Sequence, residues 1–418
     1  MTYSEKVVEA MNHADLSVME ENVNLALKHD SDEYLLALQD VLMQAGYIEL
    51  AKKVIENLLE KNPKHYDLYI PLAEIAIEDN DIEKAFELLD SIPQDSDTYV
   101  QALIVLADLY QMLGVLEVSE QKLLEAKKQA NDPIIDFALA ELYYSNGDFE
   151  KAKSLYTQLL EQGQEQLAGI SLEERIADIL VNLGQFEESV PLLEKLTEQH
   201  SDQSQLQFLL ALSYYNTDQD EKAMGIFKQL LEDNPELSAV YYYLAELLLK
   251  DNQLDAALQT AEQGLKYEPM NIGLYTLVAE VAYRQHDVKT AEEYLKQALE
   301  IEDFNGGDQA RLALATMYVN EERGEEAIEL LKDSNEMDGY AHWLMAQAYR
   351  QEEEYEEAMK HYEEARHDMD HDLAFMKDYG LMLREEGRTQ EAVRWLSHYL
   401  EHESTDMEVA DLLAEEGE

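Results

Sequence analysis

Few strings in this sequence carry residues whose types and spacing could do chemistry. The strongest is His398-Tyr-Leu-Glu401-His402, which has the H-x-x-E-H spacing of one class of zinc hydrolases. On a helix its two imidazoles share one face, as zinc ligation requires. The intervening Tyr399 and Leu400 belong to the apolar pattern of that helix, and the sequence places no third ligand. A zinc hydrolase is therefore kept only as a remote alternative.

Three other strings resemble ion sites more weakly. His367-Asp-Met-Asp-His371-Asp372 pairs two imidazoles with carboxylates, but a solvated, charged linker explains it better. Asp79-Asn-Asp81 and Asp218-Gln-Asp220 begin like calcium loops and lack the glycine and bidentate glutamate at the required offsets. No phosphate-binding glycine loop or nucleophile elbow occurs. We predict a non-enzyme with no cofactor and no metal site.

The composition excludes several classes of protein. The 418 residues include 31 Lys+Arg and 90 Asp+Glu, a formal charge of −59, which repels nucleic acid unless one surface is strongly basic. Hydrophobic residues make up 46% of the chain, enough for a packed core. There is no cysteine, no leader-like N-terminus and no run of about 18 apolar residues. These features predict a cytoplasmic protein without membrane insertion, and the charge favours a monomer.

The elements that must position any site are helices. Only 7 Pro and 16 Gly occur, and Leu, Ala, Glu, Gln and Lys dominate. Tight turns interrupt the apolar pattern at regular intervals, marked by glycine at 46, 114, 147, 184 and 387 and by polar pairs at 80–81, 251–252 and 286–287. The sequence therefore predicts paired helices joined by short turns.

A small residue follows each turn at steps of 31 to 37 residues, with a mean of 34.1. This series is Ala51, Ala85, Ser119, Ala152, Ser189, Ala223, Ala257, Ala291, Ala327, Ala358 and Ala392. Twelve residues earlier lies a second series, Gln39, Ala73, Ala107, Ala140, Ala177, Ala211, Ala245, Ala279, Ala315, Ala346 and Gly380. Two antiparallel helices approach closely only where both present small side chains. Eleven helical hairpins follow.

These features resemble the tetratricopeptide repeat (TPR), a helix-turn-helix unit of 34 residues. The clearest copy reads Leu210-Ala211-x-x-Tyr214, Ala223-x-x-x-Phe227 and Pro235. Most units lack the early Trp of the family, and its closing Pro survives only at Pro63, Pro235 and Pro269. The resemblance implies an all-α, right-handed α-solenoid of about eleven repeats with helical end caps, and a role in protein binding.

The predicted organisation has three parts. Residues 1–31 form a degenerate helical repeat that caps the N-terminus, with Thr2-x-x-Glu5 as a capping box. Residues 32–403 form the solenoid, with bends at 91–93, at a polar insertion over 163–169 and at 304–308. Residues 404–418 form a capping helix that opens at Thr405, covers the last repeat with Met407 and the apolar residues after it, and ends in an acidic tail.

The resemblance also implies where a partner binds, because first helices of the family line a groove. The residue after each first-helix small residue faces it, and seven of eleven are acidic: Asp40, Glu74, Asp108, Glu141, Asp178, Glu246 and Glu280. Helical spacing adds the aromatic residues Phe137, Tyr144, Phe208, Tyr215, Tyr242, Tyr283 and Trp343. The basic candidates are Arg350, Lys377 and Arg384, of which Lys377 and Arg384 share a helical face and suggest a C-terminal subsite.

Two interpretations of this acidic, aromatic face stay open. It is either the solvated side of a very acidic protein, with rings packed between repeats, or a groove for a segment that carries Lys or Arg. The predicted function is a non-catalytic interaction scaffold or adaptor for a protein or peptide partner. The alternative among binding proteins is a chaperone-like assembly factor for basic clients.

Overall fold

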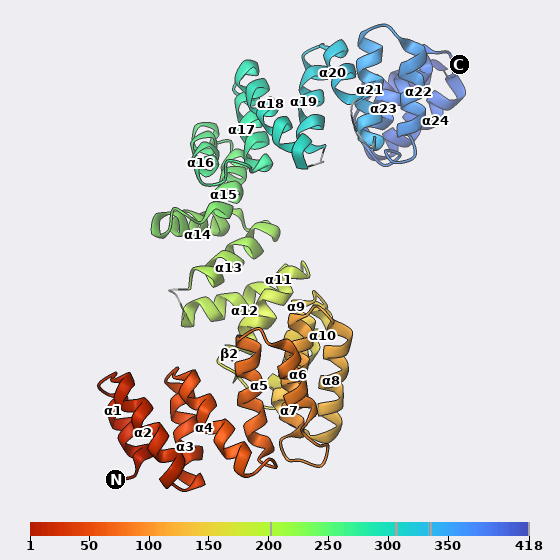
Figure 1. The fold of residues 1–418 in the computed structure, drawn as a ribbon. Coiled ribbons are helices and arrows are strands. Elements are labelled where there is room, and N and C mark those ends of the chain that lie inside the picture. Colours follow the sequence, from red (N-terminus) through yellow and green to blue (C-terminus); the bar gives the residue numbers. More distant parts are fainter. Residues whose placement is uncertain (201–202, 306–307, 333, 335–336, 417–418) are drawn as a thin grey trace. The chain divides into compact units, whose positions relative to one another are not determined.

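The structure is a computed structural model that describes residues 1–200, 203–305, 308–332, 334 and 337–416. The chain divides into two compact units, Met1–His200 and Ser201–Glu418, a boundary that the sequence did not indicate. Each unit is an array of helical hairpins (Figure 1). The predicted all-α class of helix-turn-helix repeats is confirmed.

Unit 1 contains six helical pairs. Their elements are α1 (Tyr3–Met11), α2 (Leu16–His29), α3 (Asp32–Gln44), α4 (Ile48–Lys61), the 3-10 turn η1 (Tyr66–Leu68), α5 (Tyr69–Glu78), α6 (Ile82–Asp90), α7 (Tyr99–Met112), α8 (Leu116–Gln129), α9 (Pro133–Ser145), α10 (Phe149–Glu161), β1 (Gln166–Leu167), β2 (Ile170–Ser171), α11 (Leu172–Asn182) and α12 (Phe186–Gln199).

Unit 2 contains six further pairs and one closing helix among its described residues. They are α13 (Ser204–Asn216), α14 (Asp220–Asp233), α15 (Ser238–Lys250), α16 (Leu254–Tyr267), α17 (Ile272–Arg284), α18 (Val288–Asn305), α19 (Gln309–Asn320), α20 (Gly324–Lys332), α21 (Gly339–Gln351), α22 (Tyr355–Ala365), α23 (Leu373–Glu385), α24 (Thr389–His402) and α25 (Met407–Glu416).

A left-handed residue ends the first helix of each hairpin from α3 to α24. Its φ lies between +55° and +81° at Gly46, Asn80, Gly114, Gly147, Gly184, Asp218, Asn252, His286, Glu322, Glu353 and Gly387. The next residue donates its N–H to a carbonyl five residues back, as in Arg388 to Leu383 at 2.8 Å. This hydrogen bond satisfies an otherwise free helix-end carbonyl. Glu322 and Glu353 carry no turn signal in the sequence, yet the repeat imposes the same conformation on them.

The predicted close approach of each pair is confirmed. All eleven small residues of the second helices are buried, with exposures of 0% to 2% for the alanines and 0% for Ser119 and Ser189. Their first-helix partners are buried as well. At Gly380 an added Cβ would lie 2.6 Å from a Leu396 side-chain atom, so only glycine fits there. Gln39, the one large member of the series, is buried at 6% exposure.

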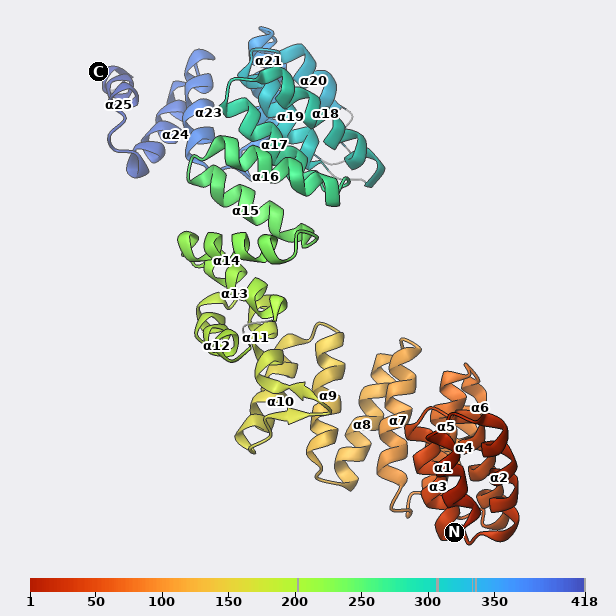
Figure 2. The ribbon, with the colours of Figure 1, turned by 90° about the vertical axis from the view of Figure 1, so that its left-hand side faces the viewer.

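The polar insertion over 163–169 adopts a conformation that we did not expect. Instead of lengthening a helix or loop, the chain pairs β1 with β2 in a two-residue antiparallel hairpin, whose arrows Figure 2 shows. Its turn residues Ala168 and Gly169 have φ values of +49° and +79°. Two consecutive left-handed residues are what a type I′ hairpin turn requires. The predicted bend at 304–308 includes residues 306 and 307, which lie outside the described part of the chain.

Both predicted end caps are helical. At the N-terminus, Thr2 and Glu5 form the expected capping box of α1. At the C-terminus the cap is Asp406 rather than Thr405, since the Asp406 carboxylate accepts the Val409 N–H at 3.2 Å. The same carboxylate accepts Lys377 Nζ at 2.8 Å and the Tyr399 hydroxyl at 2.9 Å. The hydrogen bond from Lys377 is the main cause that lowers the pKa of Asp406 to about 2.

The contact of α25 with the last repeat rests on Val409. This side chain is completely buried in a cluster with Met376, Leu396 and Tyr399. Met407, which we expected to help cover the repeat, is 68% exposed instead. Met407 lies two positions before the buried Val409, roughly 200° around the helix, so it faces away from the repeat.

A charged network ties α18 to the turn between α19 and α20. Arg323 bonds Glu292 through two nitrogens at 2.8 and 3.3 Å, and Lys296 and the Tyr318 hydroxyl bond the same carboxylate. The Arg323 guanidinium also lies 4.2 Å from the centre of the Tyr318 ring. The hydrogen bond from Arg323 is the largest cause that lowers the pKa of Glu292 to about 2. This contact joins one hairpin to the next.

The turn geometry predicts opposite effects for two glycine-to-alanine changes. Gly387 has a φ of +75°, so Gly387→Ala should destabilise the protein by about 1 kcal/mol, although nothing lies within 4 Å of the new Cβ. Gly225 lies inside α14 with equally open space, so Gly225→Ala should stabilise it by about 0.5–1 kcal/mol. Urea denaturation measures both. The same sign for both changes would contradict the left-handed assignment.

The Glu292 network predicts a pH-dependent stability difference. A carboxylate with a folded pKa near 2 stabilises the fold above its ordinary value of 4.5, and that contribution disappears as the pH falls towards 2. Glu292→Gln should therefore lower the free energy of unfolding at pH 7 by roughly 2–3 kcal/mol. The gap to the wild type should narrow steadily below pH 4.5. A gap of constant size across that range would show that the ionised carboxylate is not the cause.

Candidate functional site

A hollow in unit 2 lies on the face of its first helices. This cavity has a volume of about 850 Å³ and is lined by residues of α13, α15, α17, α18 and α19. We call it the unit 2 cavity. Five of the predicted groove residues line it: Tyr215, Tyr242, Glu246, Glu280 and Tyr283. Its apolar lining includes Leu247, Leu277, Ala279, Ala313 and Met317.

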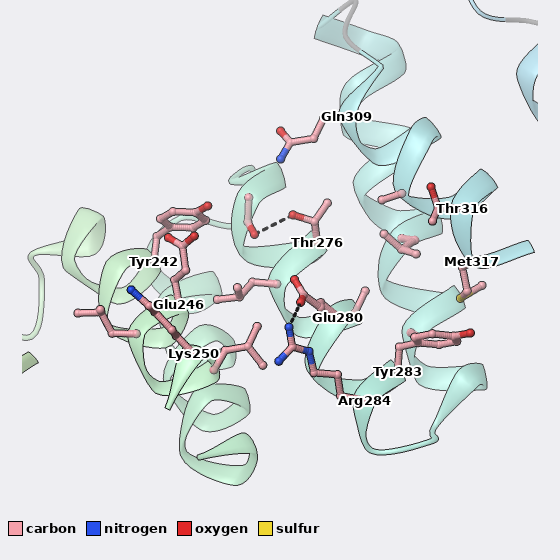
Figure 3. A pocket seen from close by; sticks show the side chains of 18 of the residues that line it. Tyr242, Glu246, Lys250, Thr276, Glu280, Tyr283, Arg284, Gln309, Thr316 and Met317 are labelled. Carbon is pink, nitrogen blue, oxygen red and sulfur yellow. Dashed lines mark hydrogen bonds and ion pairs between the residues drawn. The ribbon is translucent and has the colours of Figure 1, made fainter. Parts of the chain in front are cut away.

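Two glutamates and Asp218 are the acidic residues that line the unit 2 cavity. Figure 3 shows Glu246 and Glu280 on neighbouring first helices, with Arg284 bent back onto Glu280. The Arg284 to Glu280 distance is 2.6 Å, and both side chains are about half exposed. Glu246 accepts the Tyr215 hydroxyl at 2.7 Å. Lys250 also lines the cavity, but its ammonium is held by Asp220 at 2.7 Å and Asp218 at 3.5 Å.

Tyrosine rings form the aromatic wall of this cavity. Tyr215 and Tyr242 each contact Tyr243 edge to face, at centroid distances of 5.4 and 5.6 Å. The Tyr242 ring lies so close to Gly273 that an added Cβ there would be 3.0 Å from it. Burial raises the pKa of both Tyr215 and Tyr242. The hydrogen bond to Glu246 raises the pKa of Tyr215 further, and the charge of Glu246 raises the pKa of Tyr242 further. Both phenols are therefore neutral at physiological pH.

Unit 1 carries a second set of groove carboxylates, on α5 and α7. Burial raises the pKa of Glu74, and the charges of Glu78 and Asp108 raise it further. Burial alone raises the pKa of Asp108. Although both residues keep substantial exposed area, neither carboxylate has an ion pair or hydrogen bond with the described part of the chain. We call Glu74, Glu78 and Asp108 the unpaired acidic face. Asp40, also exposed, accepts a hydrogen bond from the Gln39 side chain.

The next two groove acids of unit 1 are engaged within the protein. Glu141 receives Arg175 through two hydrogen bonds at 2.9 and 3.0 Å and the Tyr156 hydroxyl at 2.5 Å. Asp178 accepts a hydrogen bond from Tyr144, whose ring lies 4.5 Å below the Arg175 guanidinium. Burial and the hydrogen bond to Asp178 raise the pKa of Tyr144 to about 12. Glu141 and Asp178 thus connect neighbouring repeats.

Three predicted aromatic residues pack rather than line an open surface. Phe137 is only 5% exposed and contacts Tyr156, which places it in the core. Phe208 contacts Phe227 and Tyr243 behind the unit 2 cavity. Trp343 donates its indole N–H to Asp378 at 2.7 Å and meets Phe375 edge to face.

The basic residues of the groove faces also differ from expectation. Arg350 is held by Asp378 and Glu385 at 3.0 and 2.8 Å, and Lys377 is held by Asp406. At the suggested C-terminal subsite, Lys377 is thus engaged within the protein. The sequence analysis did not identify Arg175, Lys250 and Arg284 as basic residues near the groove. Helical spacing could have found them, because each lies about one turn from a groove position.

The histidine strings form no preassembled metal centre. His398 contacts Glu401 at 3.0 Å, and the His398 and His402 ring centres are 5.4 Å apart on the exposed side of α24. Among the residues that the structure describes, no group of three or more His, Asp or Glu is arranged to hold a metal ion. Within the same residues, no helix combines the length and apolar character needed to span a bilayer.

Models of known families match several stretches of the chain. The model "YpiA-like, C-terminal tetratricopeptide repeats" matches residues 340–406, and "YpiA-like, tetratricopeptide repeats" matches residues 111–164. Two general tetratricopeptide repeat models match residues 174–238 and 221–281. The ARM repeat of tetratricopeptide repeat protein 21 matches residues 4–113.

Individual relatives were found as well. The TPR repeat-containing protein YpiA of Bacillus subtilis (strain 168) is 34% identical over 202 residues, which are 47% of this chain and 47% of that protein. The match thus spans about half the length of this curated relative. Among solved structures, the APC/C hetero-tetramer Cut9-Hcn1 matches with a TM-score of 0.48 and 12% identity, over 99% of this chain and 95% of that chain. An IFIT1 monomeric mutant with m7Gppp-AAAA has a TM-score of 0.49 and 18% identity, over 84% and 89%.

The repeat evidence from sequence, structure and family models agrees. Eleven left-handed turns and eleven buried pairs recur at the period of the TPR, and four TPR models match within the same hairpins. Stacked helical hairpins of this kind present extended binding surfaces. The chain therefore belongs to the tetratricopeptide repeat proteins, whose repeats serve as scaffolds for protein interactions.

Proposed function

We propose that this protein is a non-catalytic adaptor whose first-helix faces bind a peptide segment rich in Lys or Arg. The observation that carries the proposal is the unit 2 cavity, where three carboxylates, three tyrosine rings and an apolar floor line one hollow of about 850 Å³. A volume of this size accommodates a few side chains of an extended or helical peptide. The proposed adaptor is cytoplasmic and monomeric.

The cavity offers a lysine or arginine side chain two kinds of contact. The neutral rings of Tyr215, Tyr242 and Tyr283 supply cation–π and apolar contact worth roughly 0.5–2 kcal/mol each. Glu246 supplies a charge-assisted hydrogen bond, which is stronger than a neutral one. Glu280 is already bonded by Arg284 at 2.6 Å, so an incoming cation shares this carboxylate with Arg284. Lys250 does not oppose an incoming cation strongly, because two aspartates already neutralise it.

The unpaired acidic face of unit 1 supports the same class of partner. Desolvation and mutual repulsion raise the pKa of Glu74, and no cation of the described protein relieves it. A carboxylate in this situation gains more from an incoming cation than one that already has an internal partner. The overall charge of −59 also accelerates the encounter with a basic partner.

A chaperone-like factor for basic clients is the second candidate. It uses the same carboxylates, so the two functions differ in stoichiometry and selectivity. An adaptor binds one sequence saturably, whereas a chaperone binds many basic segments weakly. The graded affinities of a peptide panel of equal charge and different sequence separate them.

The first prediction concerns the two glutamates of the unit 2 cavity. Lys- and Arg-bearing peptides are screened by fluorescence anisotropy, and the tightest is then titrated against Glu246→Gln/Glu280→Gln. We expect its affinity to fall about tenfold or more, since each lost charge-assisted contact is worth roughly 1.5 kcal/mol or more. Moderate salt should weaken wild-type binding.

The matched control removes the same charge elsewhere in unit 2. Glu300 on α18 and Glu329 on α20 are exposed and lie outside the cavity lining. Glu300→Gln/Glu329→Gln should change the affinity by less than about twofold. If both double variants lose affinity equally, net charge rather than the cavity governs binding, and the proposed site is wrong.

The second prediction uses the raised pKa of Asp108. Because desolvation disfavours its charged form, Asp108→Asn should raise the thermal midpoint of the free protein at pH 7. If the unpaired acidic face binds a cation, the same change should weaken the basic peptide. Asp95→Asn, in the exposed connection between α6 and α7, should alter neither quantity. A more stable Asp108→Asn protein with unchanged affinity would remove unit 1 from the proposed site.

A further inference from the structure

A second kind of cleft lies in unit 2 between the α22–α23 connection and α24. It has a volume of about 480 Å³ and is lined by Arg366, His367, Asp370, Arg394, Trp395 and His398. We call it the cationic cleft. None of these residues lines the unit 2 cavity. The two histidine strings that the sequence offered separately, around His367 and His398, therefore meet at one place.

The balance of basic and acidic residues in this lining is opposite to that of the whole protein. The chain has 31 Lys+Arg against 90 Asp+Glu, yet the cleft has two arginines and two histidines against a single carboxylate. The acids beside it already have partners, and one of them, Glu401, contacts His398 of the lining itself at 3.0 Å. Arg388 bonds Glu391 at 2.6 and 2.8 Å and Glu363 at 2.5 Å.

The two arginines keep donors available. Arg394 is exposed, and the described residues offer it no hydrogen bond or ion pair. Arg366 is held in place by Glu363 through Nη1 at 2.5 Å, while its Nε is buried without a hydrogen-bond partner. Arg366 also has a hydrogen bond with the Tyr379 hydroxyl. A guanidinium has five N–H donors, so these two contacts still leave other donors of Arg366 unused.

The wall of the cleft is rigid at Trp395. Its indole meets Tyr379 and Phe375 edge to face, at centroid distances of 5.2 and 5.9 Å. This packing fixes the wall of the cleft, from which the exposed side chain of Arg394, the neighbouring residue on α24, extends.

The charges decide between a metal ion and an anion. Two histidines would suit a divalent cation, but Arg366 and Arg394 would repel it, and no three-ligand arrangement exists among the described residues. Guanidinium groups match the oxygens of phosphate and carboxylate, and a phosphate carries the larger charge. We propose that the cationic cleft binds a phosphate group, as a site separate from the peptide-binding faces.

The test measures the binding of inorganic phosphate to the full chain. Isothermal titration calorimetry at constant pH and ionic strength gives the affinity. Arg394→Gln should weaken phosphate binding about tenfold. Asp370→Asn removes the only carboxylate of the lining, so it should strengthen binding several-fold. Lys289→Gln, whose side chain is 87% exposed on α18, is the charge-matched control and should leave the affinity unchanged.

Two further titrations define the chemistry. Acetate, with a single charge, should bind several-fold more weakly than phosphate, and equal affinities would overturn the assignment to phosphate. Zinc chloride in a separate titration should give no binding that depends on His398. Zinc binding that His398→Gln abolishes, together with no response to phosphate, would replace the anion site by a metal site.

If Arg394→Gln folds poorly, the increase in phosphate affinity expected for Asp370→Asn still tests the proposal. Phosphate affinity that is indifferent to both Asp370→Asn and Arg394→Gln would overturn the proposal outright. The peptide titrations probe different residues on the first helices. A failure of the phosphate site therefore leaves the proposed adaptor function standing, and the reverse also holds.

Discussion

The close approach of two helices at a pair of small side chains is the constraint on which the rest of the structure depends. At Gly380 the partner helix is so near that no Cβ fits, and alanine or serine fills most of the equivalent places. This contact fixes the left-handed turn five residues before each second-helix small residue, even where the turn residue is Glu322 or Glu353. Because the two helices of every hairpin pack through the same contact, the same positions of each first helix face outward. The repeated contact thus produces a surface that repeats from hairpin to hairpin.

That surface is not uniform, although its sequence pattern is. Glu141 is bound by Arg175 and Tyr156, and Asp178 by Tyr144, so these acids act as links between repeats. Glu74 and Asp108 occupy the equivalent positions of earlier repeats and have no such partner among the described residues, so nothing offsets the burial that raises their pKa values. An acid that meets an internal donor stabilises the fold, and an acid that meets none retains its capacity for an external cation.

Most of the fold could be predicted from the sequence because small residues and turns recur at a fixed period. The period located both helices of each hairpin and their buried contact, and Thr2 and Glu5 gave the N-terminal cap. Contacts between side chains on different repeats could not be predicted in this way. Lys377 binds Asp406, Arg175 binds Glu141, and Trp343 binds Asp378, at separations of 29, 34 and 35 residues. The β1–β2 hairpin escaped prediction because two short strands leave no alternating pattern.

Because contacts between repeats cannot be predicted from the sequence, net charge alone could not locate a binding site. With 90 carboxylates, an acidic residue is expected at any exposed position, and only its neighbours distinguish one from another. In the unit 2 cavity the distinguishing neighbours are tyrosine rings, and in the cationic cleft they are arginines whose nearby acids Glu363 and Glu391 are already bound to Arg388. Sites of opposite preference can therefore coexist in one very acidic chain. Screening over about 8 Å at physiological salt confines each preference to its own surroundings.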